Sequence, residues 1–100
     1  MSSFIKVYDA VSKIPKGKVT TYGAISKTVG FDPRVVGYAL HANKDPRNIP
    51  CHRVINSKGK ISSGYAFGGL DAQKKMLIKE GIKFDENGVA DLKKYGFFLF

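Results

Sequence analysis

The sequence predicts a mainly α-helical domain with small β elements, built around a helix-turn-helix of the winged-helix type. Apolar residues recur at helical spacing in several short stretches. Proline, glycine and aspartate separate these stretches at positions typical of helix ends. The size agrees, because 100 residues with 43% hydrophobic content suffice for one modest core. Residues 1–100 are therefore expected to form a single domain.

The first predicted helix covers about residues 4–14 and follows two serines that can cap it. Its apolar positions at helical spacing are Phe4, Val7, Tyr8, Val11 and Ile14. Pro15 and Gly17 end this helix, and residues 18–20 form a short extended link.

The second and third predicted helices form the helix-turn-helix. The second, residues 22–29, has Thr21 as its N-cap, and Gly30 supplies the left-handed turn after it. The third runs from about 33 to 42 and begins with a proline directly after the cap residue Asp32. Two short helices joined by a tight turn that contains glycine are typical of this motif.

The third helix is the candidate recognition helix. Arg34 lies near its N-terminus. The small residues Gly37 and Ala39 leave one face of the helix without bulky side chains, which favours insertion into a nucleic-acid groove. The alternative is that Gly37 and Ala39 allow close packing against another helix. His41 is expected on the solvated surface.

The second half of the chain is predicted as alternating short elements. They are a loop at 43–50, an extended segment at 51–55, a turn at 56–59, a second strand at 60–61, a Gly-rich loop at 62–69, a helix at 70–80 ended by Gly81, and a hairpin over 82–92. The apolar tail 97–100 is expected to dock onto the core, because exposed it would form an unusual apolar patch.

The charge balance points to a polyanionic partner. The chain carries 17 basic and 8 acidic residues, a net charge of +9 and a pI near 9.8. This is typical of nucleic-acid binders, although basic domains also bind membranes or acidic proteins. One cysteine cannot form an internal disulfide, and with two histidines it offers too few ligands for a closed zinc site. We expect no metal and no cofactor, in a reducing compartment.

Cys51 is the candidate nucleophile, although a lone cysteine is usually a small buried hydrophobic residue. Pro50 fixes the residue before it, and His52 and Arg53 follow directly. Two potentially cationic neighbours favour the thiolate, the form that attacks electrophiles. A nucleophilic cysteine also needs a base, for which His52 is placed, and a carboxylate that orients the base. Composition leaves three candidates for this carboxylate: Asp71, Glu80 and Asp85.

One motif resembles a known family closely. The segment Ile49-Pro50-Cys51-His52-Arg53-Val54 is similar to the active-site signature of the O6-alkylguanine-DNA alkyltransferases, also called methylated-DNA–protein-cysteine methyltransferases. Further matches are Thr21-Tyr22-Gly23, Arg34-Val35-Val36-Gly37, Asn43, Gly64-Tyr65, Gly68-Gly69-Leu70 and Glu80-Gly81. The resemblance covers essentially the whole chain, aligned to the family's C-terminal catalytic domain. It implies that this chain has the fold of that catalytic domain and lacks the variable N-terminal domain of longer members.

The resemblance implies a role for each residue of the reacting centre. Cys51 would accept the alkyl group, and His52 would deprotonate it through a water molecule, oriented by Glu80. Asn43 would brace the turn between the recognition helix and the active-site loop. Tyr22 would donate a hydrogen bond or proton to the departing base.

The resemblance also implies contacts to DNA and to the extruded base. Arg34 would fill the gap that the flipped nucleotide leaves. The other implied DNA-binding residues are Gly37, Tyr22 and Arg53, and the implied base pocket consists of Val54, Tyr65, Ala66 and Phe67. In that pocket the backbone carbonyls of Cys51 and Val54 would accept from the exocyclic amine of guanine, and amides of residues 65–67 would lie near O6.

Four of these residues have structural alternatives. Tyr22 is alternatively a core tyrosine with its hydroxyl at the surface, and Arg34 is alternatively one phosphate contact among many. His52 is alternatively a structural hydrogen-bonding residue. Glu80 alternatively pairs with a lysine on its own helix, as residues four positions apart commonly do.

The reaction that the resemblance implies is irreversible. O6 lies inside the base stack, so the nucleotide has to be flipped out, which costs a few kcal/mol. Transfer to sulfur produces a thioether, and each molecule would act once. The implied partner is duplex DNA containing O6-alkylguanine, bound through the minor groove by a monomer. No apolar run approaches the ~20 residues of a membrane span, so we expect an intracellular protein located with the DNA, in cytoplasm, nucleoid or nucleus.

The sequence departs from the transferase pattern in two respects. Its length and the segment 14–23 also resemble the alkyltransferase-like proteins, which bind alkylated guanine without repairing it and recruit excision-repair proteins. The segment 62–69 is one or two residues longer than the usual transferase loop. Cys51 and Asn43, with Gly68-Gly69, favour a working transferase. The alternatives are a non-catalytic sensor and a plain helix-turn-helix DNA binder that retains the cysteine for packing.

Overall fold

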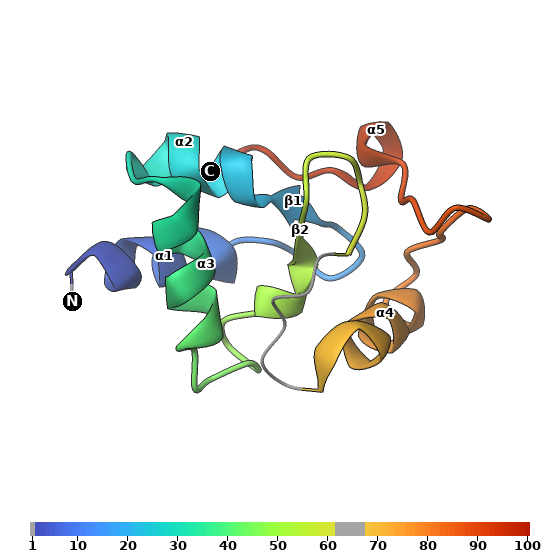
Figure 1. Cartoon of the computed structure of the whole chain (residues 1–100), viewed down its shortest axis with the longest axis horizontal. Coiled ribbons are helices and arrows are strands. Elements are labelled where there is room, and N and C mark those ends of the chain that lie inside the picture. Colours follow the sequence, from blue (N-terminus) through green and yellow to red (C-terminus); the bar gives the residue numbers. More distant parts are fainter. Residues whose placement is uncertain (1, 62–67) are drawn as a thin grey trace.

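The computed structural model describes residues 2–61 and 68–100 and shows a mainly helical chain with one small sheet (Figure 1). Its elements are α1 (Ser2–Ser12), β1 (Thr20–Thr21), α2 (Tyr22–Val29), α3 (Pro33–His41), the 3-10 helix η1 (Cys51–Arg53), β2 (Val54–Ile55), α4 (Gly69–Lys79) and α5 (Leu92–Tyr95). No helix within the described ranges is both long enough and apolar enough to cross a membrane.

The helix-turn-helix is confirmed, including its capping residues. The Thr21 hydroxyl accepts a hydrogen bond from the backbone N–H three residues later at 3.1 Å, which caps α2. Gly30 follows α2 with a φ of 82°, a left-handed conformation that glycine adopts without strain. The Asp32 carboxylate accepts from the Arg34 N–H at 2.8 Å and caps α3.

Helices α1, α2 and α3 pack around the first core cluster, and Figure 1 shows α3 lying across α1. The buried members of this cluster are Val7, Ala10, Val11, Ile14, Ile25, Val36, Ala39, Leu40, Cys51 and Val54. The apolar residues predicted for the first helix supply its α1 side, as their spacing indicates. The cluster also contains Cys51, so the active-site segment is anchored in the core of the helix-turn-helix.

A parallel pair of short strands joins the helix-turn-helix to the active-site segment. Thr20 pairs with Val54 and Thr21 with Ile55. The prediction for 51–55 was wrong in part, because residues 51–53 form η1 and only 54–55 are extended. The predicted strand at 60–61 was also wrong. Lys60 forms only an isolated bridge, with Val89. The strand that pairs with β2 is β1, into which the link predicted at 18–20 leads.

The C-terminal third folds over the second core cluster, whose buried members are Val19, Ile55, Leu77, Ile82, Ala90 and Tyr95. The predicted terminal hairpin is present as an antiparallel bridge between Phe84 and Ala90. Its second arm ends earlier than predicted, because Asp91 caps the short helix α5 by accepting from the Lys93 N–H at 3.0 Å. Helix α4 agrees with its predicted bounds within one residue at each end.

The C-terminal tail docks onto the core in part. The Phe97 N–H donates to the Val19 carbonyl at 2.7 Å, and the Phe97 and Phe100 rings pack edge to face and contact the first core cluster. Phe98 and Leu99 are 51% and 86% exposed. The first and last residues of the tail therefore dock onto the core, and the two residues between them face solvent.

Candidate functional site

Cys51 begins η1 and lies at the edge of the first core cluster. The residue is 5% exposed, and its N–H donates to the Ile49 carbonyl at 2.7 Å. Pro50 precedes it as the N-terminal flanking residue of η1. The local conformation thus follows from the proline and a tight turn, and it directs the sulfur inward instead of into solvent.

Asn43 braces the loop that precedes Cys51, in the position the family resemblance implies. The residue is 3% exposed, and its Nδ2 donates to the Ile49 carbonyl at 2.9 Å. Its Oδ1 accepts from the Asp45 N–H at 2.9 Å, and its side chain lowers the pKa of the Cys51 thiol. One buried amide therefore connects the end of α3 to the segment that carries Cys51.

A cluster of three charged or ionisable side chains lies directly after Cys51. His52 Nε2 and Glu80 Oε2 are 2.9 Å apart. Arg53 donates from Nε to Glu80 Oε1 at 2.9 Å and from Nη2 to Oε2 at 2.7 Å, a two-point contact that is stronger than a single hydrogen bond. Arg53 Nη1 donates to the Ile14 carbonyl at 2.8 Å. The cluster therefore ties together η1, the end of α4 and the residues after α1.

Among the three carboxylates left open by composition, the structure selects Glu80. Asp71 is exposed in the first turn of α4, and Asp85 accepts from the N–H groups of its own turn. Burial alone would raise the pKa of the Glu80 carboxyl, but the hydrogen bonds from Arg53 and His52 together lower it. Glu80 is therefore ionised at neutral pH and does not serve as the helix-surface partner of a lysine.

The geometry sets the tautomer of His52. Burial lowers the pKa of the imidazole, and this outweighs the opposing effect of Glu80, so the ring is neutral at pH 7. An ionised carboxylate accepts only, so Nε2 carries the proton and donates it to Glu80. Nδ1 is then the basic nitrogen; it is buried and has no hydrogen-bond partner among the described residues. The ring is thereby prepared to accept a proton at Nδ1.

The expectation that cationic neighbours favour a Cys51 thiolate was wrong for this structure. Burial raises the pKa of the thiol, and hydrogen bonds from Asn43 and the backbone lower it only in part. His52 is neutral, and the Arg53 charge is directed at Glu80. The resting group is therefore a thiol.

The cluster makes folding stability depend on pH. The pKa of His52 is lower in the folded chain than its ordinary 6.5, so below pH 6.5 the unfolded chain binds the additional proton. We expect the free energy of unfolding, measured by urea denaturation, to fall as the pH drops from 6.5 through the folded pKa. Glu80 adds a further loss in the same direction below its ordinary 4.5. His52→Asn should remove the first phase, and an unchanged profile in that variant would contradict the assignment.

The exposed face of α3 carries the predicted DNA contacts. The Arg34 side chain is 81% exposed and pairs with Asp32 at 3.3 Å. Apart from its chain neighbours and its own helix backbone, no described atom lies within 4 Å of a Cβ placed on Gly37, so no other element packs closely against this glycine. Ala39, by contrast, is fully buried, so the packing alternative holds for it. His41 is exposed, as predicted.

The remaining predicted site residues lie in three different settings. Tyr22 is half-buried against the first core cluster, and Val54 is fully buried. The Arg53 side chain is only 15% exposed and is committed to Glu80, so its predicted DNA contact stays a prediction. The pocket residues Tyr65, Ala66 and Phe67 lie outside the described residues.

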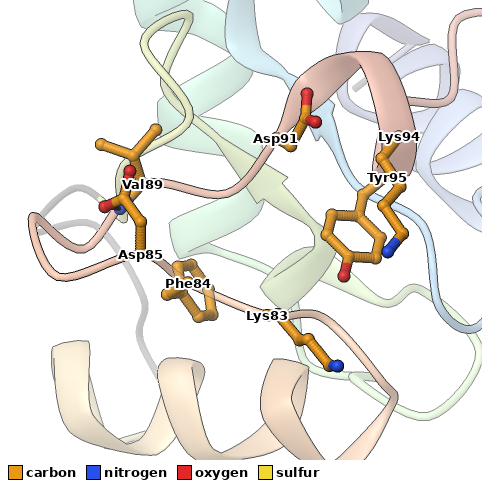
Figure 2. Close-up of a pocket in the computed structure, with 7 residues that line it drawn as sticks. All are labelled: Lys83, Phe84, Asp85, Val89, Asp91, Lys94 and Tyr95. Carbon is orange, nitrogen blue, oxygen red and sulfur yellow. Dashed lines mark hydrogen bonds between the residues drawn. The ribbon is translucent and has the colours of Figure 1, made fainter.

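A pocket of about 290 Å³ opens beside the charged cluster. It is lined by Pro46, Arg47, Pro50, His52, Arg53, Met76 and Glu80. A larger hollow of about 600 Å³ lies near α5, and Figure 2 shows its lining from Lys83 to Tyr95. Among the residues that line this second hollow, the sequence had predicted only Asp85 for the site, as one of three candidate carboxylates. Within the described ranges no three His, Cys, Asp or Glu residues gather as they would around a metal ion.

Positive charge is concentrated in the part of the chain that contains the helix-turn-helix. Residues 1–61 contain 11 of the 17 basic residues and 3 of the 8 acidic ones. The remaining residues are close to balanced. The electrostatic attraction for a polyanion is therefore strongest on the half that carries α3.

Sequence reasoning missed Gln73, which reaches the active-site segment from α4. Gln73 is 2% exposed, and its Nε2 donates to the carbonyls of His52 and Val54. The sequence contains a signal for this contact, because Gln73 lies four residues before the buried Leu77, on the apolar face of the helix. A polar residue at such a position needs a hydrogen-bond partner.

The comparisons with known proteins agree with this geometry. Residues 2–82 match the family described as 6-O-methylguanine DNA methyltransferase, DNA binding domain. Alkyltransferase-like protein 1 of Schizosaccharomyces pombe is 41% identical over 92 residues, 90% of this chain and 85% of that protein. The crystal structure of S. pombe Atl1 with damaged DNA containing O6-carboxymethylguanine superposes with a TM-score of 0.81 at 39% identity, covering 96% of this chain and 94% of that one.

Two further relatives differ in how much of their length is matched. A DNA base-flipping protein of Vibrio parahaemolyticus is 42% identical over 97 residues, with 91% of each chain covered. A methylated-DNA–protein-cysteine methyltransferase of Methanothermobacter thermautotrophicus is 41% identical over 80 residues, which are 80% of this chain but 44% of that protein. On its sequence, its fold and its site, this chain belongs to the 6-O-methylguanine DNA methyltransferase DNA-binding domain family.

Proposed function

We propose that this chain recognises O6-alkylguanine in duplex DNA, flips the damaged nucleotide out of the helix and holds its base against Cys51. The exposed Arg34 at the N-terminal end of α3, and the free space beside Gly37, support groove insertion. O6 cannot be reached inside the base stack, so a protein of this family has to extrude the nucleotide to contact it. The crystal structure of Atl1 with damaged DNA supports the same class of partner for this chain.

The similarities over the full length favour damage recognition as the core activity. The two relatives that match more than four-fifths of both chains are an alkyltransferase-like protein and a DNA base-flipping protein. The relative named as a methyltransferase is matched over less than half of its length. A sensor that binds alkylated guanine and leaves repair to excision-repair proteins is the function that these similarities support.

The reacting centre favours a second function, irreversible transfer of the alkyl group to Cys51. The observation that carries it is the thiol followed directly by a neutral imidazole whose Nε2 is held by Glu80. In this step the Cys51 proton passes through water to His52 Nδ1, and the sulfur forms a bond to the alkyl carbon as the carbon–O6 bond breaks. The electron pair leaves with guanine, and Tyr22 donates to the departing base. The product is a thioether, so each chain acts once.

The raised pKa of the thiol is consistent with such a mechanism. A thiolate exposed at all times would react with other electrophiles and oxidants. A buried thiol that ionises only through His52 reacts when a base that carries an alkyl group is in place. The low reactivity of the resting cysteine is thus a form of selectivity.

One experiment separates these functions. The chain is incubated with a duplex containing O6-methylguanine, its affinity is compared with that for the unmodified duplex, and its mass is then measured. Damage-selective binding together with a gain of one methyl group on the peptide that contains Cys51 assigns alkyl transfer. Selective binding with no mass change assigns the sensor. Equal affinity for both duplexes would indicate that the chain is a plain helix-turn-helix DNA binder, and it would contradict the proposal.

Replacing Arg34 with alanine should weaken damage recognition more than general DNA binding. If the guanidinium occupies the space of the flipped nucleotide, its loss removes an interaction made only in the flipped complex, about 1–3 kcal/mol for a specific Arg contact. We expect the preference for damaged over intact duplex, measured by fluorescence anisotropy, to fall about tenfold. Lys27→Ala, which removes an exposed charge at the end of α2, is the control and should weaken both complexes equally. An equal loss in Arg34→Ala would make Arg34 a phosphate contact.

A further inference from the structure

The hollow near α5 contains a buried tyrosine whose hydroxyl has no internal role. Tyr95 is 8% exposed and belongs to the second core cluster, and its carbonyl accepts from the Val19 N–H at 2.9 Å. Its hydroxyl forms no hydrogen bond within the described residues, and Figure 2 shows it pointing into the hollow, on the side of Lys83. A phenylalanine would fill the same place in the core, so packing explains the ring but not the hydroxyl.

The edge of this hollow carries positive charge. Lys83 and Lys94 belong to its lining. Two further lysines lie beside the lining: Lys74 Nζ is 5.7 Å from the centre of the Phe84 ring, and Lys18 Nζ donates to the Lys94 carbonyl at 3.1 Å. None of these four lysines forms an ion pair within the described part of the chain. Their ammonium groups are therefore available to an anion.

The two aspartates of the lining are engaged with the backbone of their own turns. Asp85 Oδ1 accepts from the N–H groups of Asn87 and Val89 at 2.8 and 3.0 Å. Asp91 Oδ1 accepts from the Lys93 N–H at 3.0 Å. Four lysines thus surround two carboxylates that already bind backbone donors, so the hollow has a net positive charge and favours an anionic ligand.

The rest of the lining is apolar. Phe84 and Val89 lie on the other side of the hollow from Tyr95 (Figure 2). The volume of about 600 Å³ is within the range of pockets that hold organic ligands, and it far exceeds the volume of a single carboxylate or phosphate ion. The lining therefore suits a ligand in which carboxylates adjoin an apolar side chain, which is the chemistry of an acidic peptide segment.

The hollow also lies away from the recognition helix. Figure 1 shows α5 and the turn at 85–88 in one half of the molecule and α3 in the other half. A duplex that takes up α3 in a groove is therefore not expected to cover the hollow. This separation and the apolar wall favour a protein segment over DNA phosphates as the occupant.

We propose that the hollow near α5 binds an acidic peptide segment of a partner protein. The Tyr95 hydroxyl and the ammonium groups of Lys83 and Lys94 donate to carboxylates of this segment. Phe84 and Val89 contact an apolar side chain next to those carboxylates. This binding is separate from DNA recognition and does not depend on the proposed function.

The test uses a short fluorescent synthetic peptide in which glutamate and aspartate residues flank a single phenylalanine, followed by anisotropy at about 0.15 M salt. We expect saturable binding to the wild-type chain. A peptide with glutamine and asparagine in place of the acids should bind at least about tenfold more weakly. Tyr95→Phe should weaken binding of the acidic peptide about tenfold, because a hydrogen bond to a charged acceptor is lost. Its melting temperature should stay that of the wild type, because the hydroxyl has no internal partner.

Lys94→Met and Lys93→Met form a matched pair on α5. Both remove one exposed positive charge, but only Lys94 lines the hollow. Lys94→Met should weaken peptide binding about threefold, and Lys93→Met should change it by less than about 1.5-fold. Equal losses in the two variants would show attraction by overall charge alone and would overturn the proposal. Absence of saturable binding, or wild-type affinity in Tyr95→Phe, would overturn it as well.

The same titration on the chain saturated with an O6-methylguanine duplex distinguishes the peptide from DNA as the occupant. At about 0.15 M salt the Debye length is about 8 Å, so the peptide affinity should stay within about threefold of that for the free chain. A duplex that displaces the peptide would make the hollow a DNA contact and overturn the proposal. Equal affinity for damaged and intact duplexes would contradict the proposed function and leave peptide binding in place.

Discussion

Replacing Cys51 with alanine should abolish alkyl transfer completely and leave damage-selective binding within about threefold of wild type. Cys51 is the only cysteine of the chain, so no other thiol can accept the group. The substitution removes one buried sulfur from the edge of the first core cluster and leaves the exposed face of α3 unchanged. Mass spectrometry after incubation with an O6-methylguanine duplex measures the transfer, and anisotropy measures the binding.

Two outcomes would contradict the assignment of the nucleophile. A methyl group found on the Cys51→Ala chain would place the acceptor elsewhere. Loss of damage-selective binding in a variant with wild-type melting would show that the sulfur binds the base instead of reacting with it. Ser12→Ala, at the exposed end of α1, is a control that should keep both transfer and binding.

Replacing Glu80 with glutamine should lower the free energy of unfolding by about 2–4 kcal/mol, because the buried Arg53 guanidinium loses its counter-charge. The Glu80 side chain is 13% exposed and the Arg53 side chain 15%, so little solvent replaces the lost interaction. For a domain of this size the melting temperature should fall by roughly 10–20 °C. Transfer should slow as well, because a neutral amide orients His52 less firmly than a carboxylate. Urea denaturation and single-turnover kinetics measure the two effects.

Glu86→Gln is the matched control for this substitution. Glu86 is exposed in the turn at 85–88, and its replacement should change stability by less than about 0.5 kcal/mol. A similarly small effect of Glu80→Gln would mean that the cluster of His52, Arg53 and Glu80 contributes little to the fold. A large stability loss with an unchanged transfer rate would separate the structural role of Glu80 from its role in orienting His52.

Cys51→Ala and Glu80→Gln separate the residue needed for alkyl transfer from the residue that also stabilises the fold around η1. Cys51 is required only when an alkyl group is present. Glu80 acts at all times, because through Arg53 it also connects α4 to the Ile14 carbonyl at the end of the α1 region. This hydrogen-bond network holds the His52 imidazole in a fixed orientation in the folded chain.

Local sequence determined the helix-turn-helix and its boundaries. Thr21, Gly30 and Asp32 act on atoms within a few residues of themselves, so their capping roles could be predicted from neighbouring positions alone. The order Pro50-Cys51-His52-Arg53 likewise marks the reacting segment without any knowledge of the fold. The spacing of apolar residues in α1 predicted which of its faces is buried.

Tertiary structure alone decided how the reacting centre is assembled and in which protonation state it rests. Glu80 could not be distinguished from Asp71 and Asp85 by spacing, because contact with His52 depends on how α4 packs against η1. The pairing of β1 with β2 and the reach of Gln73 also join positions about 20 to 35 residues apart, which no local pattern encodes. Burial is a property of the whole fold, and it is burial that keeps Cys51 a thiol and His52 neutral.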